Sequence, residues 1–182
     1  MLQHQPSLRM PTISHGYIIA IDPGVTTGVC VMLYTGKGQY SLIESRIICW
    51  DYRYIRIKEL FDYDPIVALI YEKFRLFPDE DGEGGKQYSR GQAYSEFEAV
   101  QVSEILCTNA WYHSKQHLLV PLPPSVKGSS KPGGIKVQIR DCDVIVVNEA
   151  ADNAKDREHA KDAYQLNRWW ITQQIKATRG RV

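Results

Sequence analysis

The sequence predicts an α/β domain in which helices cover the faces of a mixed β-sheet. Three observations favour this class. Strand-like runs joined by short glycine-bearing turns fill the stretch up to Trp50, an apolar β-branched run surrounds Ile70, and two helical patterns occupy much of the second half. The chain has 182 residues, 43% of them hydrophobic, which is enough for one domain with a sizeable core.

The first half of the chain predicts four strands and one helix. The apolar run in PIVALIYEKF is typical of a strand that is covered on both faces. Glycines in Thr35-Gly36-Lys37-Gly38 favour a hairpin turn between two of the earlier strands. The expected elements before that run are strands at Tyr17–Asp22, Gly28–Tyr34 and Tyr40–Trp50 and a short helix at about Tyr52–Phe61.

The second half begins with an acidic, glycine-rich loop, PDEDGEGGKQYSRG. A helical pattern follows in QAYSEFEAVQVSEILCTNAWYH, then a short strand in HLLVPLPP and a second loop in SVKGSSKPGG. The period of IKVQIRD fits a strand or a helix, and the last long helix is expected at about Ala150–Lys176. This order of elements matches a ribonuclease-H-like α/β fold with a central mixed five-stranded sheet flanked by helices.

The domain organisation and the location follow from composition. We expect a flexible N-terminal arm at 1–15, one RNase H-like nuclease domain at 16–176 and a basic tail at 177–182. The four cysteines show no C-x-x-C spacing, which predicts free thiols in a reducing cytoplasm. No apolar run reaches the roughly 18 residues of a membrane helix, so no membrane contact is expected. The net charge is only +1, so a polyanion such as a nucleic acid would have to bind to local patches of the surface.

Acidic residues occur where core strands end. Asp22 ends the first strand and Glu72 ends the fourth, and an ionised carboxylate taken out of water is costly unless it is paired. His159 and Asp162, three residues apart, share one face of the last helix. Each feature alone also fits a turn former or a surface hydrogen bond. Together they predict an oxygen-rich site for Mg²⁺ or Mn²⁺, which can support phosphodiester cleavage.

Four short motifs resemble those of one known family. They are Ala20-Ile21-Asp22-Pro23-Gly24 with Thr27-Gly28, then Glu72 after Ile70-Tyr71, then Pro123-Pro124-Ser125-Val126-Lys127 with Lys136-Val137-Gln138-Ile139, and finally His159-Ala160-Lys161-Asp162-Ala163. Their order over most of Tyr17–Trp170 is similar to that of the RuvC-type Holliday junction resolvases, which belong to the RNase H-like nuclease superfamily. A small chain with an altered loop is also compatible with a viral member of that family.

The resemblance implies an activity and a set of ligands. Asp22, Glu72, His159 and Asp162 would hold two Mg²⁺ or Mn²⁺ ions, with Asp22 between them. One ion would supply hydroxide and the other would neutralise the leaving oxygen. Lys127 would contact the phosphate near the cut, and Lys136 would make a plain phosphate contact. The implied reaction is that of a crossover junction endodeoxyribonuclease making symmetric paired nicks in Holliday junctions or other branched DNA.

The segment after Glu72 departs from the family pattern. The family carries an aromatic wedge there, and this chain offers Phe74 or Phe77, of which Phe74 is preferred because it shares a face with Glu72 if the strand continues. The insertion DEDGEGG would repel phosphate unless it bends away. The basic residues expected to contact the DNA backbone in this region are Arg75, Lys86 and Arg90.

Three other interpretations fit parts of the sequence. An actin-like sugar kinase or ATPase has a similar opening turn but needs a second duplicated domain. A YqgF-type RNA-processing nuclease and a non-catalytic branched-DNA-binding module of the same fold remain alternatives. Symmetric incision predicts a homodimer, with the helix from about Tyr94 to His113, carrying Val102, Ile105, Leu106 and Trp111, as its interface. Trp169 and Trp170 are an alternative interface, although such residues more often belong to the core. Branch-migration or recombination proteins are further expected partners.

Overall fold

A six-stranded mixed sheet forms the centre of the molecule, with strand order β5-β4-β1-β2-β3-β6. The structure is a computed structural model and describes residues 15–36, 39–73, 90–122, 145–147 and 154–179. The strands are β1 (Gly16–Asp22), β2 (Thr26–Gly36), β3 (Gln39–Cys49), β4 (Ile66–Glu72), β5 (Leu119–Leu122) and β6 (Ile145–Val147). β1 and β3 run antiparallel to β2, whereas β1 and β5 run parallel to β4, and β6 runs parallel to β3.

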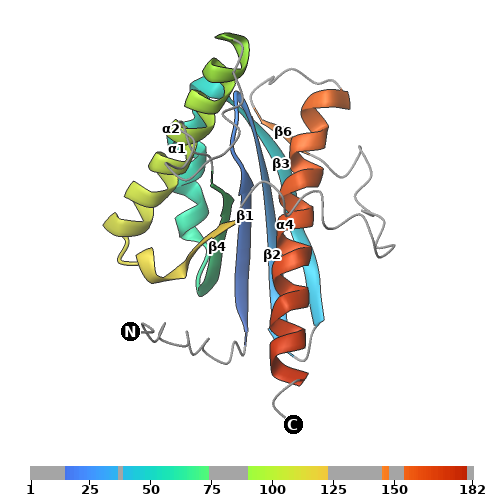
Figure 1. The fold of residues 1–182 in the computed structure, drawn as a ribbon. Helices are drawn as coiled ribbons and strands as arrows, with labels where there is room; N and C mark the ends of the chain where they lie inside the picture. Colours follow the sequence, from blue (N-terminus) through green and yellow to red (C-terminus); the bar gives the residue numbers. More distant parts are fainter. Residues whose placement is uncertain (1–14, 37–38, 74–89, 123–144, 148–153, 180–182) are drawn as a thin grey trace, which may run out of the picture.

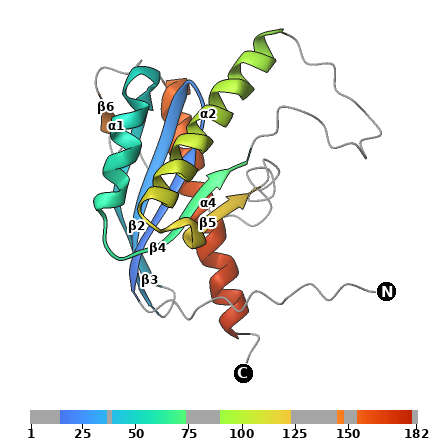
Figure 2. The same ribbon diagram turned by 90° about the vertical axis from the view of Figure 1, so that its left-hand side faces the viewer.

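Helices cover both faces of this sheet. Helix α4 (Ala154–Arg179) lies along one face, and α1 (Arg53–Lys58) and α2 (Arg90–Tyr112) lie together on the other (Figures 1 and 2). Three short 3-10 helices are also described: η1 (Trp50–Tyr52), η2 (Glu59–Asp62) and η3 (Gln116–Leu118). No helix in these described ranges is long and apolar enough to cross a membrane.

Strand alternation divides the core into two halves. In β1, Ile18 and Ala20 pack toward α4, whereas Ile19 and Ile21 pack toward α1 and α2. Successive side chains of a strand point to opposite faces, so a strand buried on both sides is apolar throughout. This is why β1 and β4 read as continuous apolar runs in the sequence.

The predicted fold class is confirmed, and the differences are local. Strands β1–β5 are the five that the sequence predicts, and the three-residue β6 joins β3 at the edge of the sheet. The single helix expected at Tyr52–Phe61 is a succession of η1, α1 and η2. The ambiguous segment 135–141 lies outside the described residues, and α4 continues to Arg179, three residues into the predicted tail.

The interface predicted on α2 is wrong in its choice of side chains. Val102, Ile105 and Leu106 are buried in the core of this same chain, where they pack on the sheet. Trp111, in contrast, is 71% exposed. The apolar stripe of an amphipathic helix faces its own sheet first, so residues at that spacing are not available to a partner.

Candidate active site

The site begins with Asp22, the last residue of β1. Ile18 and Ala20 face α4, so alternation directs Asp22 toward the same face. Its side chain is only 2% exposed. A carboxylate in that position needs a compensating partner, as the sequence indicates.

Glu72 ends β4, the strand next to β1. The two strands are parallel and Ile21 pairs with Tyr71, so one residue further on the backbones of Asp22 and Glu72 lie side by side, about 5 Å apart. Ala68 and Ile70 face α4, which directs Glu72 to that face as well. Glu72 is 3% exposed. Two acids from distant parts of the chain therefore end neighbouring strands at the same end of the sheet.

His159 reaches Asp22 from α4. Its Nδ1 atom lies 2.7 Å from Oδ2 of Asp22, although 137 residues separate the two in sequence. When Asp22 is ionised its carboxylate can only accept, and the tautomer of His159 that carries the proton on Nδ1 then donates this hydrogen bond. The side chain of His159 is 35% exposed, so the pair lies between the core and solvent. The histidine can orient Asp22 and offer its other ring nitrogen outward.

Gly28 explains how α4 comes so close. It pairs with Asp22 across the β1–β2 ladder. A Cβ atom at Gly28 would lie 2.0 Å from the carbonyl oxygen of His159 and 2.7 Å from the backbone nitrogen of Ala160. Only a residue without a side chain permits this approach of helix to strand. In the sequence Gly28 is visible only as part of a motif, and its packing role depends on the position of α4.

The turn between Asp22 and β2 is closed by a side-chain hydrogen bond. Thr27 is 1% exposed, and its hydroxyl donates to the carbonyl oxygen of Gly24 at 3.0 Å. A threonine hydroxyl that bonds to a backbone group three residues back holds such a turn in one shape. The Pro23-Gly24 turn therefore fixes the backbone that carries Asp22.

Asn167 ties α4 to the sheet two turns beyond His159. It is fully buried, and its Nδ2 donates to the carbonyl oxygen of Cys30 at 2.9 Å and to that of Ile18 at 3.5 Å. Burial raises the pKa of the neighbouring Cys30 thiol from 9.0 to about 12, so this thiol stays protonated at neutral pH. Asn167 is not among the residues predicted from the sequence, although an amide inside the apolar stripe of α4 is a visible signal.

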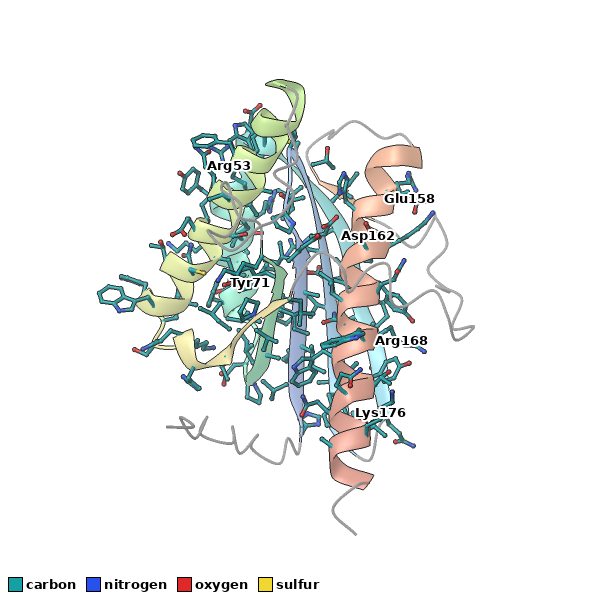
Figure 3. The ribbon with its side chains drawn as sticks, viewed as in Figure 1. Arg53, Tyr71, Glu158, Asp162, Arg168 and Lys176 are labelled. Carbon is teal, nitrogen blue, oxygen red and sulfur yellow. The ribbon has the colours of Figure 1, made fainter. Side chains whose placement is uncertain are left out.

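Asp162 lies one turn after His159 on α4 and is half-buried (Figure 3). Aspartate, glutamate and histidine are donors that suit Mg²⁺ or Mn²⁺. However, no three His, Cys, Asp or Glu side chains gather closely enough to hold a metal ion in the part of the chain that the structure describes. Carboxylates repel one another, and such a set closes only around a cation. The donor types fit the ion, and the four-ligand set stays a prediction.

The remaining predicted residues cannot be placed. Phe74, Arg75, Lys86, Lys127 and Lys136 lie outside the described residues. Arg90 is the first residue of α2, and its side chain is not described. Their assigned DNA contacts stay predictions.

Two solved structures are similar to this chain. Thermus thermophilus RuvC in complex with a Holliday junction substrate aligns with a TM-score of 0.54 and 15% identity, over 91% of this chain and 97% of that one. The chain has a RuvC-like fold. A second Thermus thermophilus RuvC structure aligns over 87% of this chain and 97% of that one, with a TM-score of 0.48 and 12% identity. No protein-family model and no curated protein matches the sequence.

Proposed function

We propose that this chain is a metal-dependent, structure-selective endonuclease that cleaves branched DNA, with the Holliday junction as its expected substrate. The observation that carries the proposal is the buried Asp22, beside Glu72 on the next parallel strand and hydrogen-bonded to His159 of α4. The RuvC-like fold supports it, and the RuvC structure with the higher TM-score contains a Holliday junction substrate.

The residues would divide the work between binding and orientation. Asp22, Glu72, His159 and Asp162 would hold divalent cations, which supply a hydroxide nucleophile and neutralise the leaving oxygen. His159 fixes the rotamer of Asp22 through the Nδ1 hydrogen bond. Gly28 and Asn167 hold α4 at the distance that this contact requires. Lys127 would place positive charge beside the scissile phosphate.

A cleavage assay tests the proposal. A labelled immobile four-way junction and a matched linear duplex are incubated with the full chain in Mg²⁺, Mn²⁺ or EDTA. We expect metal-dependent paired nicks near the crossover, absent from the duplex. Asp22→Asn and Asp162→Asn should each lower the cleavage rate by about a hundredfold or more. Junction binding should persist, because each substitution removes a charge and keeps the shape of the side chain.

Glu158→Gln is the matched control, because Glu158 lies on the same turn of α4 but is exposed and pairs with Lys161 at 2.7 Å. It should cleave at the wild-type rate. Normal cleavage by Asp162→Asn would remove this residue from the site, and the absence of cleavage by the wild type would contradict the proposal.

The second candidate is a non-catalytic module that binds branched DNA. The 2.7 Å contact of His159 Nδ1 with Asp22 favours this reading, because it gives the buried carboxylate a partner without a metal ion. Such a module would bind the junction with and without metal and leave it uncut. Buried acids at a DNA surface oppose phosphate when no cation compensates them, which favours the nuclease.

A further inference from the structure

One basic side chain beside the site is held by aromatic rings instead of by an acid. The guanidinium carbon of Arg53 lies 3.4 Å from the centre of the Trp50 ring and 4.9 Å from that of Tyr54. We call these three residues the Arg53 stack. Arg53 also donates to the carbonyl oxygen of Trp50. Because these contacts already hold the guanidinium in place, an anion that binds there costs little further side-chain entropy.

The charge of Arg53 is not neutralised by any carboxylate in the described ranges. Its basic neighbours differ in this respect. Arg56 pairs with Glu59 at 2.8 Å, and Arg46 pairs with Glu44 at 3.0 Å. Arg53 is therefore a fixed positive charge that remains available to an anion.

Of the two rings that contact Arg53, that of Tyr54 is open to solvent, whereas that of Trp50 is partly buried against the core. Tyr54 is 61% exposed, and the neighbouring Tyr52 and Ile55 are 40% and 62% exposed. Aromatic faces at this level of exposure can stack on bases, and a guanidinium suits phosphate oxygens. The combination of the open Tyr54 ring with an unneutralised guanidinium favours a nucleic-acid strand over an apolar protein surface.

The Arg53 stack lies near the end of the sheet that carries Asp22 and Glu72, which we call the catalytic edge. Thr26 pairs with Cys49, so Trp50 follows β3 next to the turn that carries Asp22. β3 lies two strands from β1, about 10 Å away. Ile47 of β3 is level with Asp22, because both residues pair with Gly28 of β2. The stack begins three residues beyond Ile47, roughly 10 Å further along. At about 3.4 Å per nucleotide along a DNA strand, the separation between Asp22 and the Arg53 stack corresponds to about four nucleotides. Figure 3 shows Arg53 and Asp162 toward the same end of the molecule.

We propose that the Arg53 stack binds the DNA backbone of the arm that leaves the active site, with Arg53 on a phosphate and Tyr54 against the adjacent sugar or base. This inference rests on the proposed function for the identity of the substrate. It adds a contact surface on the α1 side of the sheet, which the sequence motifs do not include.

The test measures equilibrium binding of a labelled four-way junction in EDTA over a range of salt concentrations. We expect Arg53→Gln to weaken binding about fivefold and to reduce the slope of log K against log salt by about 0.9, because one phosphate contact is lost. Arg53→Lys should restore the slope, and Tyr54→Ala should weaken binding while leaving the slope unchanged.

Arg168→Gln is the matched control. The Arg168 guanidinium also lies over two rings, Tyr40 at 5.1 Å and Tyr164 at 5.8 Å, but on α4 away from the catalytic edge (Figure 3). Its affinity and slope should equal those of the wild type. Circular dichroism verifies the fold of each variant, and Arg53→Lys and Tyr54→Ala keep the test decisive if Arg53→Gln misfolds.

The outcomes separate this inference from the nuclease proposal. Unchanged affinity and slope in Arg53→Gln overturn the inference, whether or not the wild type cleaves. An equal loss in Arg168→Gln, or a change in self-association without a change in DNA binding, overturns it too. If the wild type binds through Arg53 yet never cleaves with metal, the surface stands and the nuclease proposal falls.

Discussion

Gly28 controls the contact between helix and strand at the site. A Cβ atom there would overlap the backbone of His159, which has no flexible end to move aside. We expect Gly28→Ala to lower the free energy of unfolding by about 1–3 kcal/mol, the usual effect of overpacking, and to displace His159 from Asp22. Thermal unfolding measures the first effect and junction cleavage the second.

Gly24→Ala is the control for that prediction. A Cβ atom at Gly24 would lie 3.3 Å from the carbonyl oxygen of Thr26 and 3.9 Å from Cε1 of His159, so the neighbouring atoms need to shift only slightly. It should retain most stability and activity. Equal losses in the two variants would show that any side chain in this turn is harmful, and that the helix contact at Gly28 has no special role.

Single residues of the site were predictable to different degrees. Asp22 and Glu72 stand out in the sequence because each ends an apolar run with a charge, which is a local signal. The contact of His159 with Asp22 spans 137 residues and depends on where α4 lies. The role of Gly28 depends on the same placement, so neither follows from local spacing.

At the scale of elements, Asn167 anchors α4 to the sheet. Its amide donates to backbone carbonyls of β1 and β2, whereas Asn109 of α2 donates at 2.8 Å to Ile105 of its own helix. We expect Asn167→Ala to cost about 1–3 kcal/mol of unfolding free energy, since it leaves buried groups unpaired. Asn109→Ala should cost less than half as much.

Urea unfolding of the two variants measures this difference, and junction cleavage reports whether α4 has shifted. Asn167→Ala should lose cleavage as well as stability, because His159 lies on the same helix. If Asn167→Ala unfolds at the same urea concentration as the wild type, apolar packing alone places α4.

Elements were predicted well where their pattern was long. The apolar stripe of α4 and the continuous runs of β1 and β4 identify these elements without a structure. β6 has three residues, too few for any periodicity to be visible. The interface predicted on α2 was wrong for Val102, Ile105 and Leu106, because the sequence does not show which apolar residues of the helix the sheet covers.

At the scale of the whole molecule, buried groups predict a loss of stability in alkali. Burial raises the pKa of the Cys30 thiol from 9.0 to about 12 and contributes most to raising the pKa of Tyr63 from 10.0 to about 12. The folded state then keeps protons that the unfolded state releases above about pH 9. Stability contributed by these groups is complete below that pH and is lost as pH rises toward about 12.

Urea unfolding from about pH 7 to about pH 10.5, followed by tryptophan fluorescence, measures this loss. Cys30 is fully buried, and its thiol should account for up to about 1.4 kcal/mol per pH unit above about pH 9. Cys30→Ala should therefore show a shallower decline. Identical declines in wild type and variant would mean that this thiol titrates equally in both states.

The last prediction concerns assembly. A four-way junction is nearly two-fold symmetric, so paired nicks require two active sites and favour a C2 homodimer. Because Val102, Ile105 and Leu106 are buried in their own chain, the surface left for a partner on α2 is its exposed side, with Phe97 48%, Trp111 71% and Tyr112 76% exposed. We expect sedimentation at micromolar concentration to give a species of twice 20.8 kDa.

Trp111→Glu should shift that species to the monomer and abolish paired nicking, because it places a charge in an apolar contact. Ile43→Glu is the matched change on β3, where Ile43 is 45% exposed, and it should leave the dimer intact. A wild-type monomer with and without DNA would contradict the dimer. A dimer that persists in Trp111→Glu would place the interface on another surface, since aromatic residues at the centre of an interface contribute most of its binding energy.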